Sequence, residues 1–338
     1  MFQRDARAPA EKLSVRWPLV TATHGFSTRA IHAGQDPDSA VGSVVPPIYA
    51  TSTFIQDKVG EARGGYEYSR SSNPTRTALE ECMAALEGGR HGLVFASGLA
   101  AEDTLLRTIA SPGSHFVVPD DAYGGTYRLF VRVHQRWGVA ADPAHLTNLD
   151  TVAAAITPGE TKAVWIETPT NPLLNIADIA AIVDLAHSAG ALVIVDNTFA
   201  TPYLQQPLEL GADIVVHSTT KYCGGHSDII GGALVLNDDD LAEQLRFHQN
   251  AIGGGGQPIR LLARTARLAD VGRADGTPLR QCRAGGGLPR RSPADRPGLF
   301  PRARCPSRTR PGQAADAPVR RHGQLPCGRW RAGSAAGV

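Results

Sequence analysis

The chain has 338 residues, and 34 Lys+Arg against 32 Asp+Glu leave a formal net charge of only +2. A charge so close to neutral argues against nucleic acid or another polyanionic partner, and no uncharged apolar run approaches the roughly 20 residues that cross a bilayer. Five scattered cysteines in so long a chain favour a reducing compartment over disulfide cross-links. We therefore expect a soluble, cytoplasmic protein.

Residues 1–24 lack the hydrophobic period of a helix or a strand. Residues 1–24 are predicted to be a loose N-terminal extension, and residues 25–75 an arm. Within that arm, Pro46-Pro47 and the glycine-containing run 64–70 favour an extended, irregular backbone. An arm of this kind buries little of its own surface, so we expect it to lie against another surface.

From Asn73 onward the pattern is typical of regular structure. Pro74 starts a predicted helix with Leu79, Met83 and Leu86 at helical spacing, and Gly88-Gly89 ends it. Short apolar runs then alternate with helix-like stretches. The apolar runs cover 93–95, 115–118, 163–166, 192–195, 214–216 and 233–236, and the main helix-like stretches cover 100–109, 127–137 and 176–189. This alternation predicts an α/β large domain over residues 76–254, with a mainly parallel sheet covered on both faces.

Polar residues follow five of these predicted strands. Because ligands of open α/β sheets collect at the carboxyl ends of the strands, we expect these positions to converge on one edge. They are Ser97-Gly98, residues 120–123, residues 167–171, Asp196-Asn197 and residues 217–221.

Two of these polar residues carry a specific chemical hypothesis. Lys221 follows a strand and a cluster of hydroxyl residues, where a partly desolvated amine can lose its proton and form a Schiff base. Asp196 ends the most apolar strand and could keep a pyridine nitrogen protonated. The alternatives are a solvated surface lysine and an aspartate that caps the next turn.

An anion site is predicted beside them. Residues 97–100 (SGLA) lead from a strand into a helix start, where free N–H groups and the helix dipole favour an anion, and Ser218 and Thr220 add hydroxyl donors. Cys223 and His226 lack a second Cys/His pair at zinc spacing, so no metal is predicted.

Residues 213–228 (DIVVHSTTKYCGGHSD) resemble the cofactor-attachment signature of the Cys/Met-metabolism, or trans-sulfuration, family of pyridoxal-phosphate enzymes. That family includes cystathionine gamma-synthase, the cystathionine lyases and methionine gamma-lyase. Further stretches are similar to the family in the same order, from about Gly25 to Gly254. They are TRAIHAG (28–34), PIY (47–49), YSRSSNPTR (68–76), DAYGGTYR (121–128), ETPTNP (167–172) and VDNTF (195–199).

The resemblance implies a fold-type I large domain and a role for each residue at the strand ends. Lys221 would hold pyridoxal phosphate as a Schiff base, Asp196 would pair with its ring nitrogen, and Tyr123 would stack on the ring. Asn171 would bond near the phenolic oxygen of the cofactor or the substrate. The phosphate would be held by Gly98, Leu99, Ser218 and Thr220.

The resemblance also implies roles outside the chain's own cofactor site. Tyr68 and Arg70 would reach the phosphate of a neighbouring subunit, which implies a homo-oligomer with a site shared across a dimer, usually within a tetramer. Arg128 resembles a substrate-side arginine, and its alternative is a solvated helix residue. The implied reaction is gamma-replacement on an acyl-homoserine by cysteine, which gives cystathionine. Gamma-elimination by a lyase of the same family is the alternative.

Residues 255–338 lack the family pattern, contain no lysine and are rich in Arg, Pro and Gly. Three origins would give such a sequence: a basic nucleic-acid-binding segment, a divergent domain or the product of a shifted reading frame. The shifted reading frame fits the composition best. A shifted frame would remove the family's C-terminal domain, including its arginine for the substrate carboxylate. A catalytically inactive remnant is therefore the alternative from a different functional class.

Overall fold

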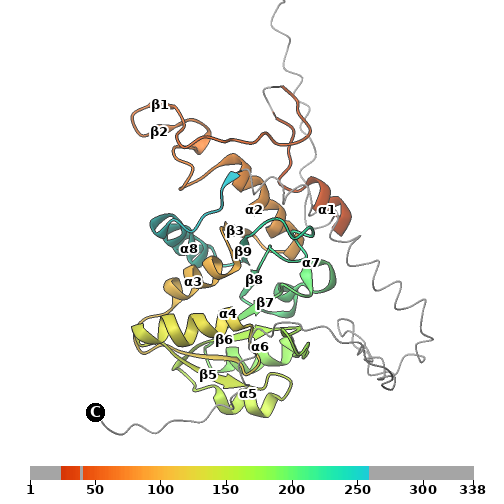
Figure 1. Cartoon of the computed structure of the whole chain (residues 1–338), viewed down its shortest axis with the longest axis vertical. Helices are drawn as coiled ribbons and strands as arrows, with labels where there is room; N and C mark the ends of the chain where they lie inside the picture. Colours follow the sequence, from red (N-terminus) through yellow and green to blue (C-terminus); the bar gives the residue numbers. More distant parts are fainter. Residues whose placement is uncertain (1–23, 39–40, 259–338) are drawn as a thin grey trace, which may run out of the picture. The chain divides into compact units, whose positions relative to one another are not determined.

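A seven-stranded sheet forms the centre of the fold in the computed structural model, which describes residues 24–38 and 41–258 (Figure 1). Its strand order is β3-β9-β8-β7-β6-β4-β5. All neighbouring pairs are parallel except those of β9, which runs antiparallel to β3 and β8. The strands are β3 (His91–Phe95), β4 (His115–Pro119), β5 (Ala140–Ala144), β6 (Thr161–Glu167), β7 (Leu192–Asp196), β8 (Ile214–His217) and β9 (Gly232–Leu236).

The predicted α/β class with a mainly parallel sheet is thus confirmed. Because β9 is antiparallel to both of its neighbours, β3 points the same way as β8. The carboxyl ends of β3, β4, β6, β7 and β8 therefore lie at one edge of the sheet, as the sequence predicts.

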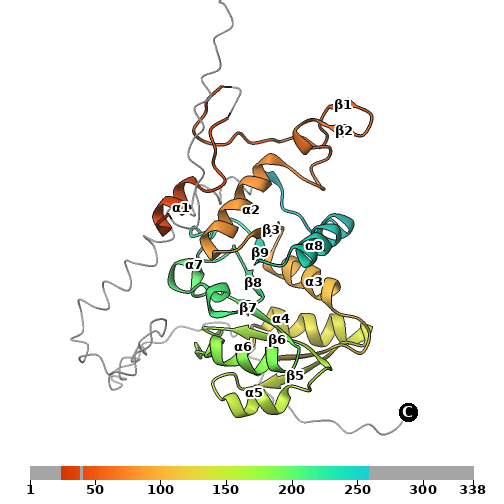
Figure 2. The same ribbon diagram turned by 180° about the vertical axis from the view of Figure 1, so that it is seen from behind.

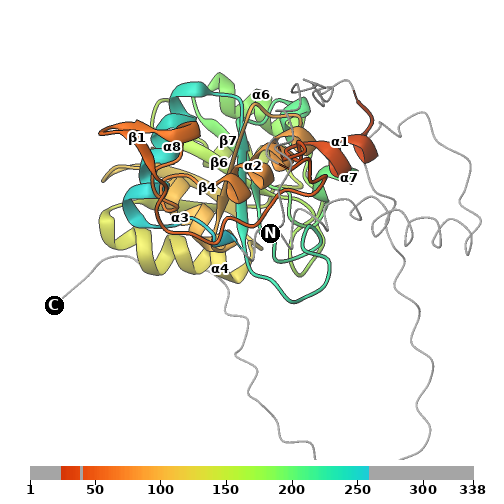
Figure 3. The same cartoon turned by 90° about the horizontal axis from the view of Figure 1, so that it is seen from above.

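Helices cover both faces of the sheet, and alternation along the strands explains this (Figures 2 and 3). Ile194 of β7 belongs to a buried cluster with residues of α3 and α8, whereas its neighbours Val193 and Val195 belong to a cluster with residues of α5 and α6. Val94 and Val215 pack with α2. The main helices are α2 (Pro74–Glu87), α3 (Gly98–Ile109), α4 (Gly124–Arg128), α5 (Leu149–Ala155), α6 (Ile179–Ser188) and α8 (Asp239–Ile252).

Local sequence sets the ends of these helices. The Asn73 side chain accepts a hydrogen bond from the Thr75 N–H, and Gly88 ends α2 with a φ of 73°. The helix predicted from Pro74 is therefore confirmed. Asp178 caps α6, so that helix begins at Ile179 rather than at residue 176.

The helix-like stretch predicted over 127–137 is helical, but its winding changes along the chain. After α4 it continues as a π-helix at η2 (Leu129–Val133) and as a 3-10 helix at η3 (His134–Trp137). This change of winding keeps both Phe130 and His134 buried, the first beside Trp165 and the second bonded to Asp103.

The N-terminal segment is only partly extended. Residues 26–32 form a helix that packs on α2 through Ala30, which the sequence pattern does not predict. A small hairpin follows. The remaining short elements are α1 (Phe26–His32), β1 (Gln56–Lys58), β2 (Glu61–Ala62), η1 (Arg63–Gly65), α7 (Thr201–Leu204) and η4 (Pro207–Leu210).

Two predictions fall largely outside the described residues. These are the N-terminal extension up to residue 23 and the Arg/Pro/Gly-rich tail from residue 259. Within residues 24–38 and 41–258, no helix is long and apolar enough to cross a membrane.

Candidate active site

A cavity of about 230 Å³ opens at the carboxyl ends of β3, β6, β7 and β8. Its lining contains all the cofactor and catalytic residues predicted from the sequence except the two residues of the arm, and it does not contain Arg128. The predicted residues that line it are Gly98, Leu99, Tyr123, Asn171, Asp196, Ser218, Thr220 and Lys221.

Asp196 lies in the buried part of this cavity at the end of β7 and is only 8% exposed. Its Oδ1 accepts a hydrogen bond from the Thr198 N–H at 2.9 Å. Burial raises the pKa of the Asp196 carboxyl, while the bonds from Thr198 and the nearby His217 oppose that rise. Asp196 therefore caps the turn after β7 and also lines the cavity, so the two interpretations of this residue are compatible.

Glu167, at the end of β6, is a second carboxyl group of the cavity. Its Oε2 accepts the N–H of Tyr123 at 2.7 Å, and its Oε1 accepts the N–H of Asn171 at 2.8 Å. Burial and the nearby Asp196 raise the pKa of Glu167 to about 8. One carboxyl group thus fixes the backbone of two predicted site residues, a role that sequence reasoning missed.

Glu102 of α3 is the third carboxyl group and was also missed. It is 4% exposed, and its Oε2 has no hydrogen-bond partner among the described residues. Burial, followed by Asp196, raises the pKa of Glu102 well above its usual value. The only signal in the sequence is its spacing of four from Leu106, which places a carboxyl on the buried face of α3.

These three carboxyl groups favour a cation. Within residues 24–38 and 41–258, no arginine or lysine forms an ion pair with Glu102, Glu167 or Asp196. Buried carboxylates without a counter-charge are costly. A cationic ring nitrogen placed beside Asp196 would relieve that cost.

An anion site lies at the N-terminus of α3. Ser97 caps the helix through the Ala100 N–H at 3.1 Å, and the N–H groups of Gly98 and Leu99 bond to no acceptor among the described residues. A Cβ at Gly98 would lie 2.9 Å from the Ser218 Cβ, so only glycine leaves room here. The Thr220 hydroxyl exchanges hydrogen bonds with the backbone of Gly231 at 3.2 and 3.1 Å. This end of the cavity suits a phosphate.

Lys221 lies at the mouth of the cavity and also lines a neighbouring one. Its backbone N–H closes a turn onto Ser218 O at 3.1 Å. Lys221 belongs to the exposed residues of this structure, so its partial desolvation stays a prediction.

Tyr68, Arg70 and Arg128 are not brought to this cavity. Arg70 lies over the Tyr68 ring at 5.4 Å and donates from Nε to Asn250 Oδ1 at 3.1 Å, and both arm residues are exposed. Arg128 is exposed at the end of α4, which agrees with the solvated-helix interpretation.

Comparison with known proteins identifies the family. Residues 27–264 match the model of the Cys/Met metabolism PLP-dependent enzyme family. The chain belongs to this family. It is 60% identical over 229 residues to cystathionine gamma-synthase of Mycobacterium tuberculosis, covering 68% of this chain and 59% of that protein. The chain thus spans about three fifths of the length of the curated relatives it matches.

Solved structures agree with this family. The crystal structure of metB from Corynebacterium glutamicum has a TM-score of 0.72 and 50% identity, with 74% of this chain and 64% of that chain covered. Cystathionine gamma-lyase from Lactobacillus plantarum, complexed with L-serine, has a TM-score of 0.71 and 46% identity, with coverage of 73% and 64%. The family's cofactor is pyridoxal phosphate, and the cavity fits it, with buried carboxyls for a cationic ring and free N–H groups for a phosphate.

Proposed function

We propose that the chain is the cofactor-binding part of a trans-sulfuration enzyme that joins cysteine to an acyl-homoserine by gamma-replacement, giving cystathionine. One observation carries this proposal: a single cavity combines buried carboxyl groups, an anion site at the start of α3 and Lys221 at its mouth. The 60% identity to a cystathionine gamma-synthase supports the choice of reaction.

Each end of the cavity would hold one part of the cofactor. Asp196 would pair with the ring nitrogen. Tyr123 would lie against the ring, since its backbone is fixed by Glu167, and Asn171 would bond near the phenolic oxygen. Lys221 Nζ would attach the cofactor covalently. The phosphate would be held by Gly98, Leu99, Ser218 and Thr220.

Bound pyridoxal phosphate supplies an electron sink for bond breaking at the α and γ carbons of an amino acid. The protein supplies the proton transfers and the orientation. Lys221 Nζ, exposed at the mouth, would take the proton from the substrate's α carbon and return protons during the reaction. Arg128 is the substrate-side arginine that the family resemblance suggests, but it lies exposed at the end of α4 and does not line the cavity.

The arm would act on another copy of the chain. Tyr68 and Arg70 lie apart from their own cavity and are exposed, so they could reach the cofactor phosphate of a neighbouring subunit. We therefore propose a homo-oligomer in the cytoplasm. In each copy, residues 25–75 form the arm and residues 76–254 form the large domain. The substrates are small amino acids.

Two alternatives are tested by the same experiment. The 46% identity to a cystathionine gamma-lyase supports elimination rather than replacement. The Arg/Pro/Gly-rich composition of residues 255–338, which contain no lysine, is the basis for the alternative of an inactive remnant.

The test adds pyridoxal phosphate to the purified chain and measures absorbance near the visible edge, followed by borohydride reduction and peptide mass spectrometry. A reduced adduct at Lys221, with cystathionine formed from cysteine and an acyl-homoserine, supports the proposal. Release of α-keto acid from cystathionine supports the lyase, and an adduct without turnover supports the remnant. The absence of any adduct at Lys221 contradicts the synthase and the lyase.

A further inference from the structure

The first turn of α2 buries three polar side chains that the cofactor site does not use. Asn73, Thr75 and Arg76 are 1%, 1% and 3% exposed. They belong to the motif NPTR (73–76), which is part of the family resemblance but lines no part of the cavity. Buried polar groups of this kind are costly unless they are bonded, so their partners indicate what they do.

Asn73 and Thr75 bond to two separate parts of the arm. Thr75 Oγ1 accepts the Tyr49 N–H at 3.0 Å and donates to Pro47 O at 3.2 Å. Asn73 Nδ2 donates to Tyr49 O and to Ser69 Oγ, both at 3.0 Å. The start of α2 therefore holds the arm at residues 47–49 and again at residue 69.

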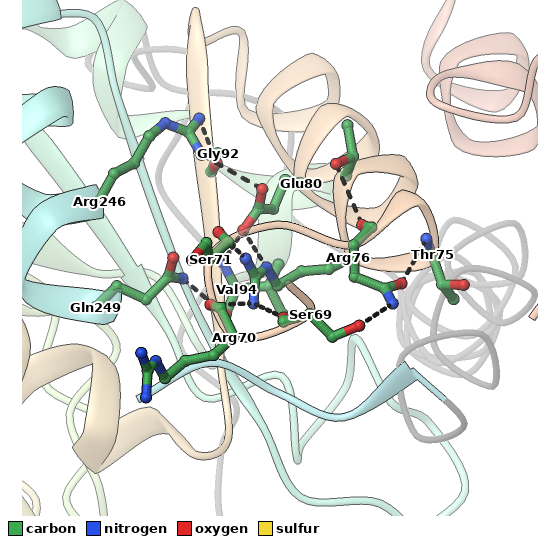
Figure 4. Close-up of polar contacts among 12 residues, drawn as sticks. Ser69, Arg70, Ser71, Thr75, Arg76, Glu80, Gly92, Val94, Arg246 and Gln249 are labelled. Atoms are coloured by element: carbon green, nitrogen blue, oxygen red, sulfur yellow. Dashed lines mark hydrogen bonds and ion pairs between the residues drawn. The ribbon is translucent and has the colours of Figure 1, made fainter. Parts of the chain in front are cut away.

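The guanidinium group of Arg76 points toward three consecutive backbone carbonyls of the arm, those of residues 69–71 (Figure 4). Its Nη1 donates to Ser69 O and Arg70 O, both at 3.2 Å, and its Nη2 donates to Ser71 O. Nε lies 3.4 Å from Glu80 Oε1. Burial lowers the pKa of the Arg76 side chain, and Glu80 opposes that change.

Glu80 links this contact to the rest of the fold. The same carboxylate accepts the Val94 N–H of β3 at 3.1 Å and pairs with Arg246 of α8 at 3.4 Å. Arg246 also bonds to Gly92 O at 3.3 Å. Arg246 thus shares the Glu80 carboxylate with Arg76 but makes none of its bonds to the arm.

We infer that Asn73, Thr75 and Arg76 are positioning residues that clamp the arm, and that they hold Arg70 and Tyr68 clear of the chain's own cavity for use by a second copy of the chain. The inference rests on the proposed function in its second half, since it takes Arg70 to act on a neighbouring subunit. Its first half, the clamp, rests on the hydrogen bonds alone. A planar guanidinium with five donors can bond to three carbonyls at once, which a lysine ammonium cannot do in this geometry.

Limited proteolysis of the chain without cofactor tests the clamp. Trypsin must capture the Arg70 carbonyl, which Arg76 holds, so Arg76→Gln is expected to speed cleavage after Arg70 by roughly tenfold. Arg76→Lys, which keeps the charge but not the fork, is expected to give an intermediate rate.

The matched control is Arg246→Gln, which loses contacts to Glu80 and Gly92 but none to the arm. Its cleavage after Arg70 is expected to stay within about twofold of the unmodified chain. Equal acceleration by Arg246→Gln and Arg76→Gln would show general loosening and overturn the clamp. An unchanged rate in Arg76→Gln would overturn it as well.

The dissociation constant of pyridoxal phosphate tests the second half by a double-mutant cycle. If Arg76 acts through Arg70, then Arg76→Gln and Arg70→Ala each weaken binding, and the double variant is no weaker than Arg70→Ala within about twofold. Multiplying effects would show that Arg76 acts by another route and overturn the link. If Arg70→Ala alone changes nothing, the proposed role of Arg70 fails, and the clamp is then decided by the proteolysis.

Discussion

Because Glu167 is buried, it makes the stability of the chain without cofactor depend on pH. Glu167→Gln should remove this dependence. The pKa of Glu167 is raised from 4.5 to about 8 by burial and by Asp196. Below about pH 4.5 the group is protonated in both the folded and the unfolded chain. Between pH 4.5 and 8 the unfolded chain loses this proton while the folded chain keeps it, so stability falls as the pH rises. Above pH 8 the loss is complete.

The size of the effect follows from the same values. Each pH unit between the two pKa values costs about 1.4 kcal/mol, so the change between pH 5 and pH 8 is about 3 to 4 kcal/mol. Glutamine removes this titration but offers one acceptor where Glu167 offers two, to the N–H groups of Tyr123 and Asn171. The lost bond costs roughly 2 kcal/mol at every pH.

The two contributions predict a crossing. At pH 5 the Glu167→Gln chain should be less stable than the unmodified chain by about 1 kcal/mol, and at pH 8 it should be more stable by about 2 kcal/mol. Urea unfolding of both chains at several pH values between 5 and 9 measures the difference. Asp196 and His217 remain in both chains, but Asp196 helps to raise the pKa of Glu167, so the difference reports the Glu167–Asp196 pair rather than Glu167 alone.

Parallel stability curves would refute this reasoning. They would mean that Glu167 titrates near its ordinary pKa in the folded chain. The carboxyl group would then be better hydrated than the 5% exposure of Glu167 indicates. Glu160, an exposed carboxyl on the loop before β6, provides the matched control. Glu160→Gln should shift stability by less than about 0.5 kcal/mol at every pH, because surface substitutions have small effects.

Three further predictions concern the cofactor. Lys221→Ala should abolish the borohydride-reducible adduct and leave the cofactor loosely bound, and a surviving adduct would exclude Lys221 as the attachment site. If residues 255–338 are the product of a shifted reading frame, Asp196→Asn made in the frame-restored chain should keep cofactor binding and lose turnover, and near-normal turnover would show that Asp196 only caps its turn. The chain as printed should bind cofactor more weakly and form less cystathionine than the frame-restored chain. Equal activity of the two would make residues 255–338 a functional domain.

Most of the sheet and the position of the cavity could be predicted from the sequence, because both depend on local patterns. The apolar runs that form β3, β4, β6, β7, β8 and β9 are short and bounded by polar residues, which is typical of strands buried on both faces. The polar residues just beyond them lie together because the strands point the same way. β5 was missed, since its sequence AADPA contains no apolar run and forms an edge strand paired only to β4.

The direction of β9 could not be predicted, because direction is a property of connections rather than of composition. The 14 residues between β8 and β9 form no helix, whereas a parallel pair needs a crossover, usually a helix, that returns along the sheet. The loop from Ser218 to Gly231 instead keeps Lys221 at the strand end and closes on itself through the Thr220 hydroxyl. The antiparallel strand therefore follows from a loop that keeps Lys221 at the cavity rather than crossing over the sheet.

The roles of Glu167 and Glu102 could not be predicted by inspecting each strand end separately. Glu167, the last residue of β6, was grouped with the four residues that follow it, although its two oxygens accept the N–H groups of Tyr123 and Asn171. Glu102 reaches the cavity from the second turn of α3, a position that no strand-end rule inspects. Only the folded structure shows that both groups lie near Asp196. Burial, followed by Asp196, raises the pKa of both. Because no lysine or arginine of residues 24–38 and 41–258 pairs with these three buried carboxyl groups, the empty cavity is less stable than a cavity around a cationic ring, and the burial that weakens the chain without cofactor should strengthen its hold on one.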